Sequence, residues 1–268
     1  MKLGIVVASE GASANAFAVF RGIKSSAPII HSLGYDGMEL ALKNPNEITR
    51  DELKSILKTN SLEVSAISTG QVFATRGLMF TEEDRERREA LFDAFRGFID
   101  LASDFGGLVN VGRVRGTIGD RDKAHCEELF MNLMNRVLDY AEPRGVTILL
   151  EPVNRYEIDY INSVDEGGDL VRKVGRKNFR LMPDVFHMNI EDAHFGDAFR
   201  RNADVVGYVH LADSNRHGCG DGHLDFEEVF SALHEIGYNS WCTVECFPVP
   251  DALTAAARSI DYLRGRFI

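Results

Sequence analysis

Residues 146–152 read VTILLEP, a β-branched and apolar run that ends on an acidic residue, Glu151. The second half of the chain repeats this arrangement three times. FRLMPD at 179–184 ends on Asp184, VVGYVH at 205–210 ends on His210, and WCTVEC at 241–246 carries Glu245 beside its last position. Each run therefore places a side chain that binds hard or borderline metal ions at the end of a predicted strand.

The four residues are separated by 33, 26 and 35 positions, each close to the roughly 30 residues of one strand-plus-helix unit. Short β-branched runs alternate with amphipathic segments along the whole chain, which is typical of a parallel sheet with helical connections. This alternation predicts an α/β fold of the (β/α)8 TIM barrel type, in which the C-terminal strand ends meet at one rim. We predict eight strands, at residues 2–8, 37–42, 64–69, 108–114, 146–153, 179–185, 205–212 and 241–247.

A doubly wound open sheet is the competing arrangement, and it normally carries a glycine-rich phosphate turn after its first strand. The turn at residues 9–17 reads SEGASANAF, which lacks the GxGxxG pattern. No proline- or serine-rich linker divides the chain, so we predict one barrel domain over residues 1–268. Ser163 with Glu166 has the pattern of a capping box, and Thr81 before three acidic residues is the expected start of a long helix.

The composition, with 44% hydrophobic residues and a net charge of −11, is that of a globular protein. A nucleic-acid-binding protein normally presents a basic face, so this charge argues against a nucleic-acid partner. The longest apolar runs fall far short of the roughly 20 residues that span a bilayer, and no signal-peptide pattern opens the chain. We expect a cytoplasmic protein with no membrane partner.

The four cysteines, Cys126, Cys219, Cys242 and Cys246, form no CxxC pair. They are too few for a disulfide scaffold. We predict plain buried thiols in a reducing compartment.

Three carboxylates and an imidazole at one rim predict a divalent-metal site formed by Glu151, Asp184, His210 and Glu245. A single acidic residue at a strand end is more often solvated or an N-cap, but four consecutive units that each end in a ligand type are hard to reach by chance. Burying unpaired carboxylates is costly, and a cation relieves that cost. The oxygen-rich donor set favours Mn²⁺, and Mg²⁺, Co²⁺ or Zn²⁺ also fit.

Four stretches together resemble a known family: EPVNRYE at 151–157, DVFHMNIED at 184–192, HLADSNRHGCGDGHLDF at 210–226 and VECF at 244–247. They are similar to the sugar isomerases and epimerases of the xylose-isomerase-like TIM barrels. Within that family the nearest resemblance is to the ketose 3-epimerases of the D-tagatose and D-allulose 3-epimerase type, followed by hydroxypyruvate isomerase.

The resemblance implies roles for individual residues. The family's metal ligands match the four residues already found from spacing. Its substrate-contacting residues match Glu157, His187 and Arg216, and its two metal-binding glutamates, here Glu151 and Glu245, act as the acid/base pair on opposite faces of the substrate. The resemblance also implies a homodimer or homotetramer.

This chemistry fits inversion of C3 of a ketose through a metal-stabilised enediolate. The same groups would serve an aldose–ketose or hydroxypyruvate isomerase, and a lyase of the inosose or dehydroshikimate dehydratase type remains an alternative. An endonuclease IV-like nuclease would need further histidine ligands and a basic face. A metal-free sugar-binding module would not need two opposed carboxylates.

The type of sugar is left open by the sequence. Five arginines lie in or near predicted rim loops and could meet a phosphate, whereas the net negative charge favours a neutral sugar. These arginines are Arg76, Arg113, Arg115, Arg155 and Arg216. Cys219 and Cys246 stand where relatives often have proline, which leaves the specific substrate open.

Overall fold

The computed structural model describes residues 1–13 and 16–268, so two positions of the turn at 9–17 lie outside the described residues. All eight predicted strands are present, several of them shorter than predicted. They are β1 (Lys2–Ala8), β3 (Gly37–Ala41), β4 (Glu63–Ser68), β5 (Leu108–Val111), β6 (Thr147–Leu150), β7 (Phe179–Leu181), β8 (Val209–Leu211) and β9 (Trp241–Val244). A two-residue strand, β2 (Phe20–Arg21), pairs with β1 and was not predicted.

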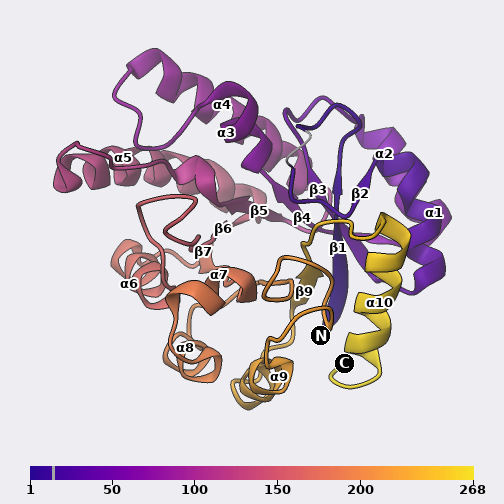
Figure 1. Ribbon diagram of the computed structural model, residues 1–268. Helices are drawn as coiled ribbons and strands as arrows, with labels where there is room; N and C mark the ends of the chain where they lie inside the picture. The colour runs from indigo at the N-terminus through magenta and orange to yellow at the C-terminus, as the bar shows by residue number, and fades with distance from the viewer. Residues whose placement is uncertain (14–15) are drawn as a thin grey trace.

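Helices connect the strands and lie around the outside of the sheet (Figure 1). They are α1 (Ile23–Leu33), α2 (Arg50–Asn60), α3 (Gly70–Arg76), α4 (Arg85–Ala102), α5 (Lys123–Ala141), α6 (Val164–Val174), α7 (Val185–Glu191), α8 (Phe195–Arg201), α9 (Phe226–Glu235) and α10 (Ala252–Arg264). Two 3-10 turns, η1 (Arg113–Arg115) and η2 (Glu142–Arg144), follow β5 and α5.

The strands pair in parallel in the order β7-β6-β5-β4-β3-β1-β9-β8. Backbone hydrogen bonds join the two ends of this path, from Leu181 N to Val205 O at 2.9 Å and from Gly207 N to Leu181 O at 2.8 Å. These bonds link β7 to the segment that leads into β8. The prediction of a TIM barrel is confirmed.

Two helix starts show how local sequence sets the connections. The Ser163 hydroxyl accepts from Glu166 N, and the Glu166 carboxylate accepts in return, so the predicted capping box at α6 is confirmed. The expected helix start at Thr81 is wrong, because α4 begins at Arg85 and the Asp84 carboxylate caps it. The Thr81 hydroxyl instead donates to Thr117 O at 2.9 Å and ties down the loop before the helix.

A polar layer crosses the barrel interior one step below the rim. The Tyr208 hydroxyl lies 2.8 Å from a Glu39 oxygen, 2.8 Å from Ser65 Oγ and 2.6 Å from Thr243 Oγ1, and all four side chains are buried. Gly4 makes room for this layer, since a Cβ there would lie 2.4 Å from Thr243 Oγ1. Side chains two positions apart on an extended segment share a face. His210 lies two positions after Tyr208, so it also points into the barrel, nearer the rim.

The four cysteines are buried and free, as predicted. Among the described residues no helix has both the length and the apolar character required to cross a membrane.

Candidate metal centre and substrate pocket

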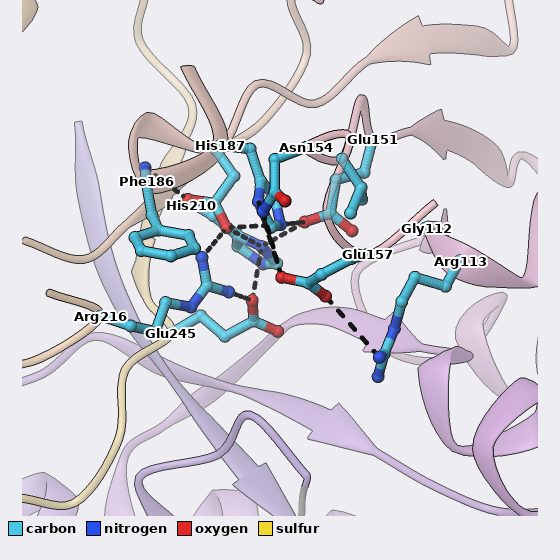
Figure 2. Close-up of polar contacts among 12 residues, drawn as sticks. Gly112, Arg113, Glu151, Asn154, Glu157, Phe186, His187, His210, Arg216 and Glu245 are labelled. Atoms are coloured by element: carbon cyan, nitrogen blue, oxygen red, sulfur yellow. Dashed lines mark hydrogen bonds and ion pairs between the residues drawn. The ribbon is translucent and has the colours of Figure 1, made fainter. Parts of the chain in front are cut away.

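The four predicted ligands converge at the C-terminal rim of the barrel. One ligand atom from each of Glu151, Asp184, His210 and Glu245 lies within 4.8 Å of every other, and all four residues are buried. Figure 2 shows the side chains of Glu151, His210 and Glu245 pointing toward a common centre. The barrel therefore brings together residues that span 94 positions of the chain.

The backbone places each ligand slightly differently at the rim. Glu151 and Glu245 directly follow β6 and β9, His210 lies within β8, and Asp184 lies three residues beyond β7, where its carboxylate caps α7. An isolated bridge pairs Asp184 with His210, and His210 N donates to Pro183 O at 2.9 Å. This bridge holds two candidate ligands beside one another.

The His210 ring has one satisfied and one unsatisfied nitrogen. Its Nε2 lies 2.8 Å from a Glu39 carboxylate oxygen, whereas Nδ1 is buried without a hydrogen-bond partner. Nδ1 lies 3.4 Å from Glu151 Oε1, 3.5 Å from Glu245 Oε2 and 3.9 Å from Asp184 Oδ2. An unpartnered imidazole nitrogen that faces three carboxylates fits a divalent cation, which these four residues would hold.

Charge repulsion within the cluster also favours a cation. Burial raises the pKa of Glu245 to about 8 against the opposing charges of His210 and Arg216, and the charges of Glu151 and Asp184 add to that rise. Burial lowers the pKa of His210, but the carboxylates of Glu39, Glu245 and Glu151 outweigh it and raise this pKa well above its usual range. A bound cation would replace the proton that these carboxylates otherwise attract.

Arg216 lies against the same carboxylates. Its Nη1 is 2.5 Å from Asp184 Oδ2, its Nη2 contacts Glu245 Oε2, and the residue is only 2% exposed. The guanidinium also packs over the rings of Phe17 and Phe186, 5.0 and 4.8 Å from their centroids. Its backbone has a φ of 60°, an unusual conformation for a residue with a side chain.

Asn154 sets the orientation of His187. The Asn154 amide nitrogen lies 2.7 Å from His187 Nδ1 and 3.2 Å from Glu157 Oε1, and its amide oxygen accepts from Tyr156 N. Since an amide nitrogen only donates, Nδ1 accepts and the ring proton sits on Nε2. That nitrogen lies 3.9 Å from Glu151 Oε1. Burial lowers the pKa of His187 to about 3, so the ring is neutral.

Glu157 lies farther from the cluster than His187. One of its oxygens is 4.0 Å from His187 Nδ1, and the other is 3.6 Å from Arg113 Nη1. Burial raises the pKa of Glu157, which the charges of Arg216 and Arg113 partly counteract. These contacts form a line of polar side chains from the metal ligands to Arg113 (Figure 2).

A pocket of about 520 Å³, part of it open to solvent, covers this line of side chains. Five of the seven predicted site residues line it, and the other two, Asp184 and His210, are buried and do not. The lining residues are Ala16, Phe17, Ala41, Ser68, Gly70, Gln71, Asn110, Gly112, Arg113, Glu151, Val153, Glu157, His187, Arg216 and Glu245.

Sequence reasoning did not assign three residues that shape the site. Glu39 is an acidic residue inside the apolar strand β3, a pattern that signals a buried partner without naming it. Asn154 lies within the stretch EPVNRYE, but its role depends on a histidine 33 positions away. Gly112 leaves space for the Glu151 carboxylate, since a Cβ there would lie 2.5 Å from Glu151 Oε2.

The family described as Xylose isomerase-like TIM barrel matches residues 28–266 of this chain. The chain belongs to that family. L-ribulose 3-epimerase of Methylomonas sp. (strain DH-1) is 33% identical over 217 residues, which cover 80% of this chain and 74% of the relative. D-psicose 3-epimerase of Agrobacterium fabrum is 28% identical over 227 residues, which cover 81% of this chain and 77% of that relative.

A solved structure also matches closely in fold. The crystal structure of D-allulose 3-epimerase from Methylomonas sp. in complex with D-allulose superposes with a TM-score of 0.84 at 25% sequence identity. The match covers all of this chain and 97% of the other.

Proposed function

We propose that this member of the xylose isomerase-like TIM barrel family is a divalent-metal-dependent ketose 3-epimerase. Relatives that match about four fifths of the chain include the D-psicose and L-ribulose 3-epimerases, and the chain is an enzyme of the isomerase class. The reaction, the metal and the residue roles given below are the proposal.

The unsatisfied Nδ1 of His210, facing three buried carboxylates, is the observation that carries the proposal. Glu151, Asp184, His210 and Glu245 would hold the ion, and the oxygen-rich set favours Mn²⁺. When bound, the ion acts as a Lewis acid that stabilises negative charge as it develops on the ketose oxygen.

Glu151 and Glu245 act as the acid/base pair that transfers protons to and from C3 of the substrate. They follow β6 and β9, which lie on different sides of the barrel mouth, and a substrate between them would present one face to each carboxylate. One glutamate removes the proton from C3, and the other returns a proton to the opposite face, which inverts that centre.

The remaining predicted residues hold the substrate. The Nε2–H of His187 can donate to a substrate oxygen, and the Glu157 carboxylate can accept from a hydroxyl group. Arg216 contacts both Asp184 and Glu245, so it orients those carboxylates and presents its guanidinium at the pocket wall.

The test is incubation of Mn²⁺-loaded protein with a panel of ketoses in D₂O. Deuterium at C3 together with the C3 diastereomer is the expected result. Deuterium at C1 or C2 would instead identify an aldose–ketose isomerase, and loss of water with enone absorbance would identify a lyase. Absence of solvent exchange with every ketose would overturn the proposed reaction.

A further inference from the structure

The structure separates the five rim arginines by what their side chains contact. Arg155 pairs with Glu191, its Nη2 2.7 Å from Oε2, and Arg76 is exposed at the end of α3. Arg115 is fully buried and donates to backbone carbonyls. Among the described residues, Arg113 and Arg216 are the arginines that line the pocket.

Arg113 differs from Arg216 in the number and closeness of the carboxylates that its guanidinium contacts. Arg216 has a carboxylate at each of its two terminal nitrogens. Among the residues that the structure describes, Arg113 has a single ion pair, with Glu157 at 3.6 Å, which is too long for a hydrogen bond. Its side chain is 26% exposed, and its guanidinium lies over the Phe17 ring at 5.2 Å from the centroid. Within the described ranges, 1–13 and 16–268, the donors of this guanidinium are therefore available to bind a ligand.

The position of Arg113 fits one end of a bound substrate. The polar line runs from the metal ligands through His187 and Glu157 to Arg113 (Figure 2). The Phe17 ring forms an apolar surface beside the Arg113 guanidinium. A ketose whose reacting oxygens lie at the metal would extend its far end toward Arg113. A guanidinium presents its donors in a planar fork that matches the paired oxygens of a carboxylate or phosphate.

We infer that the substrate carries an oxyanion, a carboxylate or a phosphate, at the end distant from the metal, and that Arg113 binds it. This inference rests on the proposed function and specifies its substrate class. It departs from the neutral sugar that the net charge of −11 favours. Recognition depends on the groups inside the pocket, whereas most of the acidic residues lie elsewhere on the chain.

Glu157 is the competing explanation for Arg113, because the guanidinium could serve only to hold that carboxylate in place. The two roles predict opposite effects of a Glu157 substitution. If Arg113 binds an oxyanion, E157Q removes a competing negative charge and strengthens binding of acidic ligands relative to neutral ones. If Arg113 only positions Glu157, R113Q and E157Q weaken the binding of neutral and acidic ligands to the same extent.

The experiment measures binding rather than turnover, so that it stands apart from the proposed reaction. Four ketohexoses, fructose, tagatose, psicose and sorbose, are titrated into Mn²⁺-loaded protein by calorimetry, each as the free sugar, the C6 carboxylate and the 6-phosphate. We expect one anionic series to bind about 10- to 100-fold more tightly than the free sugars, the range for hydrogen bonds to a charged group. The series with the advantage identifies carboxylate or phosphate.

Substitutions then locate the source of that advantage. R113Q should remove it, R113K should keep part of it, and R76Q, which removes a rim arginine outside the pocket, should leave it unchanged. The inference is overturned if no anionic ketose binds more tightly than its neutral counterpart, or if R113Q weakens all three series equally. Anion preference without deuterium exchange from D₂O would refute the epimerase proposal and leave the anion site in place.

Discussion

The Glu39 carboxylate and the His210 imidazole, 171 positions apart in the chain, meet at 2.8 Å with both side chains fully buried. The His210 Nε2–H donates to the Glu39 carboxylate, and this hydrogen bond fixes the ring with Nδ1 directed at the carboxylate cluster. A metal-ligating histidine commonly donates its other ring N–H to a carboxylate, which fixes the tautomer and raises the basicity of the ligand nitrogen. Glu39 is therefore a positioning residue for the candidate metal centre.

Replacing Glu39 with glutamine should weaken Mn²⁺ binding by about 10- to 100-fold. The amide keeps the size of the side chain but removes the charge that orients and polarises His210. Titration of metal-stripped protein by calorimetry measures the affinity directly. E63Q provides a matched control, because Glu63 on the neighbouring β4 forms an exposed ion pair with Lys2. Equal Mn²⁺ affinity in E39Q and E63Q would show that Glu39 does not position His210 for metal binding.

Replacing Glu245 with glutamine should abolish turnover and weaken metal binding, because one side chain serves both functions. At saturating Mn²⁺ we expect kcat to fall by about 10²- to 10⁴-fold, the usual contribution of a general acid–base group. Near-normal kcat would contradict the proposed proton transfer. E235Q, which alters an exposed ion pair with Arg200, should leave kcat unchanged.

Stabilisation of the protein by Mn²⁺ should increase with pH. The pKa of His210 is raised well above its usual range in the metal-free protein, so protonated His210 stabilises the fold fully below a pH of about 6.5, the value in the unfolded chain. This contribution is lost as the pH rises through the raised value. A cation takes the place of the proton, so the gain in Tm on adding Mn²⁺ should be smallest near pH 6. A gain that is independent of pH from 6 to 9 would count against metal binding at His210.

Replacing Arg115 with methionine should destabilise the fold by about 3 kcal/mol or more, since each buried carbonyl left unsatisfied costs about 1–3 kcal/mol. Arg115 donates through Nε to Tyr160 O at 2.5 Å, through Nη1 to Gly112 O at 3.0 Å and Glu151 O at 2.7 Å, and through Nη2 to Ile161 O at 2.7 Å. Urea unfolding measures the change.

R176M is the matched control for this substitution. Arg176 forms two ion pairs with exposed carboxylates, and such surface pairs contribute about 0–1 kcal/mol. Similar losses in R115M and R176M would show that the four carbonyl contacts do not hold the rim together.

The barrel was predictable from the sequence because strand spacing and apolar alternation are local features. The four ligand types could be grouped for the same reason, since parallel strands of a barrel bring their C-terminal ends to one rim. The exact strand ends were less predictable. Residues 108–114 were expected to form one strand, but β5 ends at Val111 and the η1 turn follows.

Sequence by itself thus determined the fold and the set of groups at its rim, because both follow from periodicity along the chain. Only the tertiary structure decided which groups are paired. In the folded barrel Arg115 donates to backbone carbonyls, Arg216 pairs with the carboxylates of the cluster, and Glu39 pairs with His210. Arg113 instead lines the pocket. These partners come from segments far apart in the sequence, and the direction of each side chain is set by packing that no local pattern records.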